Sequence, residues 1–245
     1  MGKNGTEVAK NASDLVLADD NFATIVNAVE IGRGLFDNIK KSVRFLLSSN
    51  IGEILLVFSA FLLGYSTPLL PIQLLWINLV TDSLPAMALG MERPEKDIMS
   101  RKPLAKDKGI ITKTEGFDIA VEGMLFGALS LFAFIFGTTR YSIDTGRTMA
   151  FCALSFLEIF HAFNVRSTHS IFKISPVENI NLFFSTIICA LLQISVVIIH
   201  PLIRIFNTVP LNLQQWLVVG FLCIPPIIVS EAEKFLQNKK QLKKQ

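Results

Sequence analysis

The sequence has 245 residues, 51% of them hydrophobic, and its mean hydropathy of +0.50 is too high for a soluble domain of this size. Its net charge of +3 argues against nucleic-acid binding, because the basic residues lie between apolar blocks rather than in one stripe. The 3 cysteines are widely separated inside apolar segments, without metal-ligand spacing, and no signal peptide is visible.

Residues 1–27 have the mixed composition of soluble structure. Glycines predict a turn at residues 2–5, a short helix is expected near residues 8–12, and Leu15-Val16-Leu17 predicts a buried strand. The polar residues at 19–21 indicate a loop and a helix start. This stretch is too small to form its own core. We therefore expect the C-terminal edge of a larger cytoplasmic domain, and the chain reads as truncated.

The first predicted membrane helix, residues 28–64, is polar in its first half and apolar from Phe45 onward, and it stops at Gly64. A helix of about 36 residues reaches about 54 Å at 1.5 Å per residue, which exceeds the thickness of a bilayer by several turns. The pattern therefore predicts a stalk that joins the soluble edge to the membrane.

The fold class predicted from the whole pattern is an all-α polytopic membrane protein with six transmembrane helices and a short remnant of an α/β cytoplasmic domain. The loop at 92–116 holds seven Lys or Arg residues, so the positive-inside rule places both termini in the cytoplasm. The membrane domain is assigned to residues 28–245. Its predicted spans are 28–64, 72–91, 117–138, 147–165, 180–200 and 212–231.

Oxygen-bearing side chains interrupt the first two predicted spans. Asn50 and Glu53 are three residues apart in the first span and share a helix face. Asn78, Thr81 and Asp82 likewise share one face of the second span. Polar side chains at membrane depth are costly and usually face a bundle interior or a cavity. These five residues are therefore candidates for a functional site.

Pro85 strengthens this hypothesis, because its missing N–H leaves the carbonyl of Thr81 without its usual helical partner and tends to open the helix. Free carbonyls within a membrane are tolerated where they line a cavity or coordinate a cation. Glu158 adds a third carboxylate from the fourth predicted span. Calcium favours six to eight oxygen ligands of these types, whereas copper and zinc favour sulfur and imidazole. The side chains indicate a site for a hard cation such as calcium.

A purely structural interpretation stays open for these residues. Asn and Thr in membrane helices often serve only as hydrogen-bond partners between helices. His161, one turn after Glu158, is a proton carrier on one interpretation and a hydrogen-bonded bundle histidine on the favoured one. Glu122, near the start of the third predicted span, is expected close to the membrane interface.

Two sequence stretches resemble a known family. Residues 48–53 read Ser-Ser-Asn-Ile-Gly-Glu, and residues 73–86 read Gln-Leu-Leu-Trp-Ile-Asn-Leu-Val-Thr-Asp-Ser-Leu-Pro-Ala. They resemble the fifth and sixth membrane helices of P-type calcium-transporting ATPases of the sarcoplasmic-reticulum type. Residues 1–10 and 12–22 are similar to the end of the phosphorylation domain of that family. The resemblance covers the whole chain, and it is strongest up to about residue 116.

The resemblance implies two calcium sites and no catalytic residue within this chain. One site would use five side chains, which are Asn50, Glu53, Thr81, Asp82 and Glu158. The second would use Asn78, Asp82 and groups from a fourth helix outside the chain. The implied partners are the lipid bilayer and the N-terminal part of the same protein, with its first four membrane helices and its cytoplasmic domains. Mg-ATP would bind only there, and the chain alone is expected to be inactive.

Two finer expectations also follow from the resemblance. Glu53 together with Glu158 indicates a pump that moves two calcium ions per cycle. The loop at 92–116 resembles a segment that contacts the phosphorylation domain and relays its movement, and an exposed basic loop is the alternative. Two other functions stay open on the sequence alone: an ATP-independent cation channel or exchanger that uses the same carboxylates, and a non-catalytic assembly module.

Overall fold

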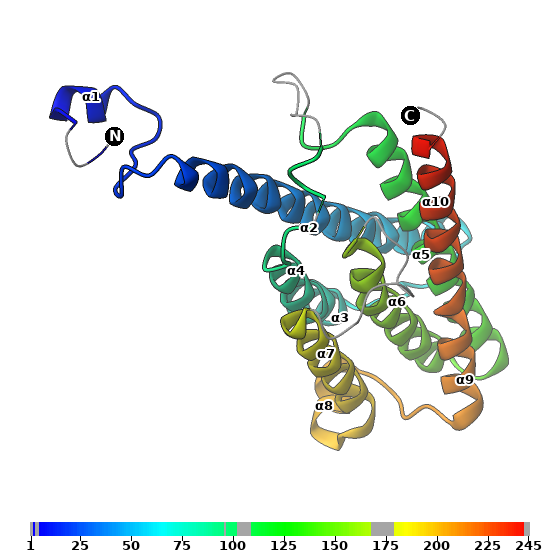
Figure 1. Cartoon of the computed structure of the whole chain (residues 1–245). Helices are drawn as coiled ribbons and strands as arrows, with labels where there is room; N and C mark the ends of the chain where they lie inside the picture. The colour runs from blue at the N-terminus through cyan, green and yellow to red at the C-terminus, as the bar shows by residue number, and fades with distance from the viewer. Residues whose placement is uncertain (1, 3–4, 96, 102–108, 168–178, 243–245) are drawn as a thin grey trace.

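The computed structural model describes residues 2, 5–95, 97–101, 109–167 and 179–242, with the backbone alone for 236–242. All regular secondary structure of these residues is helical, and six helical segments are long and apolar enough to cross a membrane (Figure 1). The predicted all-α polytopic fold is confirmed. The elements are α1 (Glu7–Asn11), α2 (Ala23–Leu62), α3 (Pro71–Trp76), η1 (Ile77–Asp82), α4 (Ser83–Gly90), α5 (Lys113–Arg140), α6 (Ile143–Val165), α7 (Ile180–Ile198), α8 (His200–Phe206), α9 (Leu213–Leu222) and α10 (Ile224–Leu242).

The N-terminal segment contains the expected short helix but not the expected strand. Helix α1 begins after Thr6, whose hydroxyl accepts a hydrogen bond from the N–H of Ala9 at 3.3 Å. The prediction of a buried strand at residues 15–17 was wrong, because Leu15 and Val16 are exposed and no described segment pairs with them as a neighbouring strand. A short run of apolar residues forms a strand only where a neighbouring strand pairs with it.

Helix α2 is a single uninterrupted helix of 40 residues, which corresponds to about 60 Å. It starts at Ala23, within the soluble segment, five residues before the predicted start. It ends in a Schellman motif, in which the N–H of Tyr65 bonds to the carbonyl of Ala60 and that of Gly64 to the carbonyl of Phe61. Gly64 has φ +75°, a conformation that favours glycine, so the predicted stop at Gly64 is explained by its backbone.

Helices α2 and α5 approach each other closely at small residues. A methyl group added at Gly123 would lie 2.5 Å from Cγ2 of Ile51 and 3.0 Å from the carbonyl oxygen of Ser48. One added at Gly127 would lie 3.1 Å from the carbonyl oxygen of Gly52. Small residues four apart let two membrane helices pack backbone against backbone. This contact fixes the position of α2 beside α5 at the level of Gly52.

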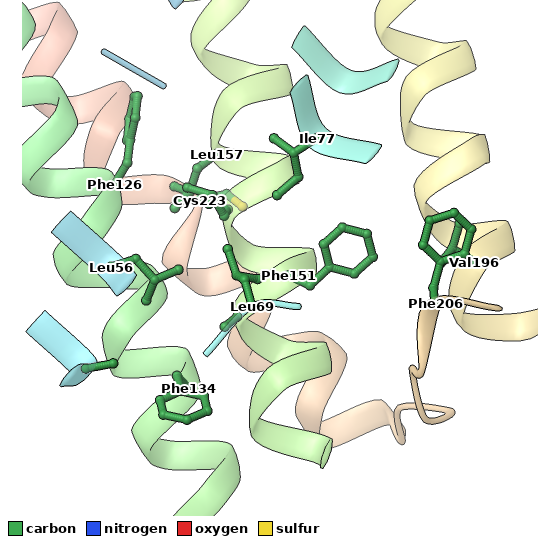
Figure 2. Close-up of a cluster of buried hydrophobic side chains, with 13 residues drawn as sticks. Leu56, Leu69, Ile77, Phe126, Phe134, Phe151, Leu157, Val196, Phe206 and Cys223 are labelled. Atoms are coloured by element: carbon green, nitrogen blue, oxygen red, sulfur yellow. The ribbon is translucent and has the colours of Figure 1, made fainter. Parts of the chain in front are cut away.

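Helix α6 is the central helix of the bundle. In its most apolar stretch 83% of the residues are buried, against 33–44% in the other five segments. Figure 2 shows the main hydrophobic cluster, to which α2 contributes Leu56, α5 contributes Phe126, and α6 contributes Phe151 and Leu157. Close packing of side chains, rather than water exclusion, holds helices together within lipid. A polar group on the inner face of α6 is therefore surrounded by protein.

The boundaries of the later spans follow from local sequence signals. Helix α5 starts before the predicted residue 117, because Thr112 and Glu115 form a capping box, with the N–H of Thr112 bonded to Oε2 of Glu115 at 2.7 Å. The last predicted span is broken at Cys223 between α9 and α10, and α10 carries Pro225 and Pro226 in its first turn, where proline is well tolerated.

Candidate cation site in the membrane-spanning helices

The second membrane segment is opened by a π-helical turn at the place where its polar residues lie. This turn, η1, contains Asn78, Thr81 and Asp82. The carbonyl of Val80 accepts a hydrogen bond from Sγ of Cys189 on α7 at 3.4 Å. In an i to i+5 register its helical partner would be the N–H of residue 85, which proline lacks. The opening expected near Pro85 is present, and it takes the form of a π-helix.

Glu53 and Asn78 connect α2 to η1. The amide nitrogen of Asn78 donates hydrogen bonds to Oε1 and Oε2 of Glu53 at 2.8 and 2.9 Å, and also to the carbonyl of Leu74 at 3.0 Å. Glu53 is buried, whereas Asn78 lies at the surface of the described bundle. The structure thus brings together two predicted site residues that are 25 positions apart in the sequence.

Asp82 and Glu158 carry the most exceptional polar atoms of the site. Their exposed fractions are 1% and 0%, and none of their four carboxyl oxygens has a hydrogen-bond partner among the described residues. Each is close enough to the other and to Glu53 for electrostatic repulsion. Buried carboxyl groups without partners are costly, unless a cation or a proton neutralises them. The arrangement therefore demands positive charge.

Asn50 and Thr81 direct their donor groups toward their own helices. The amide nitrogen of Asn50 donates to the carbonyl of Leu46 at 2.6 Å, and the hydroxyl of Thr81 donates to the carbonyl of Ile77 at 2.9 Å. With the donors used in this way, the amide oxygen of Asn50 and the hydroxyl lone pairs of Thr81 remain as acceptors. Neutral oxygen acceptors next to carboxylates are typical calcium ligands.

These residues do not yet form a closed ligand shell. Over the described ranges, no group of three or more His, Cys, Asp or Glu side chains is close enough to hold a metal ion. Glu53 also borders an apolar groove of about 490 Å³ on the α2 surface, lined by Val57, Phe58, Phe61 and Leu74 among others. The groove beside Glu53 leaves space where a further helix could pack against α2.

His161 lies beside the candidate site in a network of its own. Its Nε2 is 3.0 Å from Oγ of Ser48 and 3.6 Å from Oε2 of Glu122, and its ring packs against Phe45 and Phe126. These contacts match the favoured interpretation of a hydrogen-bonded bundle histidine.

Glu122 is held by Arg44, which contacts both of its carboxyl oxygens, at 2.5 and 3.1 Å. Sequence reasoning assigned Arg44 to the stalk and missed this ion pair. Both residues lie where their helices turn apolar, and that shared position was the available signal.

The segment after α4 is tied to α2 by side chains that the sequence did not single out. Arg33 donates to the carbonyls of Ile98 and Arg101 at 3.0 Å each. Arg101 in turn pairs with Asp37 at 2.8 Å and contacts Glu95. Burial raises the pKa of Glu95. The charge of Lys41 and hydrogen bonds from Arg101 and Ser167 together lower this pKa by more than burial raises it, so the pKa of Glu95 lies below its ordinary value. Within the predicted 92–116 loop, Lys102 and Pro103 lie outside the described residues.

Comparison with known proteins gives consistent matches along the chain. Residues 66–236 match the protein family described as cation transporting ATPase, C-terminus. The chain is 44% identical to calcium-transporting ATPase 1 of Bacillus cereus and 43% identical to the calcium-transporting ATPase of Bacillus subtilis, with 97% and 98% of this chain aligned. It is 38% identical, over 96% of its length, to the endoplasmic reticulum-type calcium-transporting ATPase 3 of Arabidopsis thaliana. The aligned parts cover 29%, 27% and 26% of these relatives.

Proposed function

The chain belongs to the family of cation-transporting ATPases, whose C-terminal region it matches, and from this premise we propose that it forms the transport region of an ATP-driven calcium pump. The relatives described above carry calcium transport in their names. The observation that carries the proposal is the set of four buried carboxyl oxygens of Asp82 and Glu158 without a hydrogen-bond partner in the described chain. Calcium is the substrate that these oxygens would take.

The proposed first site uses side chains from three helical segments. Glu53 and Asn50 come from α2, Thr81 and Asp82 from η1, and Glu158 from α6. When calcium enters, Glu53 would exchange the amide of Asn78 for the ion. Asn78 would then be free to turn its amide oxygen toward a second ion, which Asp82 would share. The wider turn of η1 supports this proposal because π-helical turns occur frequently at functional sites.

The path of ATP energy to the site is also part of the proposal. In the longer protein an aspartate outside these 245 residues would be phosphorylated from Mg-ATP, and α2 would carry the resulting movement to Asn50 and Glu53. Once calcium has left, protons are the countercharge available to the emptied carboxyl groups. We expect no ATP hydrolysis by the chain alone, and calcium-dependent phosphorylation of the isolated chain would contradict this.

The proposed partner is the remainder of the pump, and the proposed orientation has both termini in the cytoplasm. The apolar groove beside Glu53 and the surface position of Asn78 support a further membrane helix packed there. The basic residues between the end of α4 and the start of α5 support the orientation. Labelling of single cysteines introduced at Lys10 and at Arg204 tests it, since only the first would react from the cytoplasmic side.

Calcium binding to the purified chain in nanodiscs, followed by titration calorimetry, tests the proposed site. Asp82→Asn is expected to weaken calcium binding at least tenfold, because it removes a charged oxygen ligand that both proposed sites share. Asp144→Asn is the matched control, since Asp144 is exposed at the start of α6. Equal affinity in the Asp82 variant and the control would overturn the assignment. Calcium flux through liposomes without ATP would favour a channel instead.

A further inference from the structure

A second cavity, of about 250 Å³, lies at the end of the bundle where α5 begins and α6 ends. Figure 1 shows the course of the helices at this end of the bundle. Its wall is formed by the polar half of α2, the first turns of α5, the last turn of α6, the charged part of α10, and parts of the segments that follow α4 and α6. It is separate from the carboxylate site, because none of Glu53, Asp82 and Glu158 lines it. The proposed calcium function leaves this cavity without a role.

The acidic side chains of the lining are already paired with bases. Lys40 contacts Glu115 at 2.5 Å, and Arg44, whose closer partner is Glu122, contacts Glu233 at 3.5 Å. Arg101 contacts both Asp37 and Glu95. The two bases that remain in the lining are Lys41 and Lys234. Lys234 is 3.9 Å from Glu231, which lies outside the lining, and Lys41 has no described ion pair within 4 Å. The lining holds five bases and four acids, so its own side chains leave an excess of one positive charge, and Glu95 lies near enough to Lys41 to offset part of the charge of Lys41.

Two buried side chains of the lining also lack hydrogen-bond partners. Asn164, at the end of α6, is 3% exposed, and neither its amide nitrogen nor its amide oxygen has a partner in the described structure. Lys234 is 9% exposed, and its Nζ has no hydrogen-bond acceptor among the described residues. Buried polar groups in folded proteins are almost always satisfied by protein, water or a ligand. Both side chains face the same cavity, so one occupant would satisfy both.

We propose that this cavity binds a phosphate group, carried either by inorganic phosphate or by the headgroup of an anionic lipid. Lys41 and Lys234 supply two ammonium groups from opposite helices, and Asn164 and Ser230 supply an amide and a hydroxyl. Phosphate has acceptor oxygens for several donors at once, and its negative charge matches the excess positive charge of the lining. Basic pockets between membrane helices are a known setting for lipid headgroups. The volume is several times the ~30 Å³ share of one water molecule, which leaves room for such a group.

The test measures phosphate binding directly and does not depend on calcium transport. The whole chain, purified in neutral detergent, is titrated with inorganic phosphate and followed by phosphorus NMR line broadening, with chloride at equal ionic strength as the control for screening. In parallel, the chain is reconstituted in nanodiscs of phosphatidylcholine with and without phosphatidic acid, and native mass spectrometry counts the anionic lipids that stay bound. The first arm detects free phosphate and the second detects a headgroup.

Lys234→Met is expected to weaken binding in the responding arm about tenfold, because it removes a charged donor and keeps the length of the side chain. Lys113→Met is the matched control: Lys113 is an exposed lysine at the start of α5 that does not line the cavity. Asn164→Asp is a second variant, which adds a negative charge to the lining and should weaken binding in the same arm. Circular dichroism confirms that each variant is folded.

Binding in either arm that both cavity variants weaken and Lys113→Met preserves would support the proposal, and the responding arm identifies the source of the phosphate. Absence of binding in both arms, or equal loss in the cavity variants and the control, would overturn it. In that case water alone fills the cavity.

Discussion

Both carboxyl oxygens of Glu53 accept hydrogen bonds from the amide nitrogen of Asn78, at 2.8 and 2.9 Å. One amide thus holds the apolar half of α2 against the π-helical turn. In the proposed function the same pair would separate when calcium binds, because Glu53 cannot use the same lone pairs for the amide and for the ion. The pair is therefore a contact that substrate binding would replace.

Replacing Asn78 with alanine removes this contact. We expect a loss of about 1 kcal/mol in stability, which is typical of a hydrogen bond that is partly open to its surroundings. The measurement is thermal unfolding of the chain in nanodiscs without calcium. Asn181→Ala is the control, since Asn181 is exposed and its described contact is a weak one with Met91. Equal destabilisation by both variants would show that the pair with Glu53 contributes nothing.

Pro85→Ala supplies the N–H that η1 lacks. We expect the helix to return to the α register and to become more stable, because proline inside a helix costs about 3 kcal/mol relative to alanine. We also expect weaker calcium binding, because the side chains of η1 would rotate relative to Glu158. Pro201→Ala is the matched control, since Pro201 lies in the first turn of α8, where proline is well tolerated. Unchanged calcium binding in Pro85→Ala would contradict a role for the π-helical turn.

The ion pair of Arg44 and Glu122 provides a double-mutant cycle. Arg44→Met leaves a carboxylate that is 5% exposed, so we expect a loss of about 3 kcal/mol, at the lower end of the range for broken buried pairs. The double variant Arg44→Met with Glu122→Met should recover most of this loss, because it removes the buried carboxylate together with its partner. Chemical unfolding of all four forms gives the coupling energy, and a coupling of zero would refute a stabilising pair.

The depressed pKa of Glu95 leads to a prediction of how low pH affects the segment after α4. Its pKa lies below the ordinary value of 4.5 in the folded chain, so its contribution to stability is present above that value and is lost as the pH falls through the depressed pKa. We expect protease cleavage at residues 97–101 to rise as the pH falls below 4.5 and through the depressed pKa. Glu95→Gln should make cleavage nearly independent of pH. Glu30→Gln, an exposed control on α2, should leave the acid response intact, and a loss of response in both would contradict the prediction.

Substitution of Gly123 tests the close contact between α2 and α5. Gly123→Val places a branched side chain where even a methyl group would lie 2.5 Å from Ile51, so we expect a loss of about 1–3 kcal/mol from overpacking. Gly32→Ala has no atom within 4 Å of the new methyl group and should be neutral or stabilising by up to about 1 kcal/mol. Thermal unfolding compares them, and equal behaviour would exclude close packing at Gly123.

The sequence was sufficient for the six spans, because the length of each apolar stretch indicates a membrane helix. It was also sufficient to place an opening near Pro85. The π-helical register of that opening was not predictable, because it involves a hydrogen bond from Sγ of Cys189, on a distant helix, to the carbonyl of Val80. The hydrogen bond between Glu53 and Asn78 likewise requires knowing how two helices are turned toward each other.

The failed strand at residues 15–17 and the missed pair of Arg44 and Glu122 have the same physical origin. Each depends on a partner that is remote in sequence: a neighbouring strand in the first case, and a residue 78 positions away in the second. A local sequence pattern indicates which secondary structure or contact a segment can form when a suitable partner segment lies beside it. It does not indicate whether the folded chain places such a partner there.

The unbroken length of α2 gives it the mechanics of a lever. Its contact with the glycines of α5 at Gly52 would act as a fulcrum, about 44 Å along the axis from Ala23, and Glu53 is the next residue. A tilt that moved Ala23 by roughly 10 Å would shift the backbone of Glu53 by well under 1 Å, in proportion to the two arm lengths. A large movement of Ala23 would therefore change the direction of the helix axis at Glu53, while the backbone of Glu53 itself would hardly move.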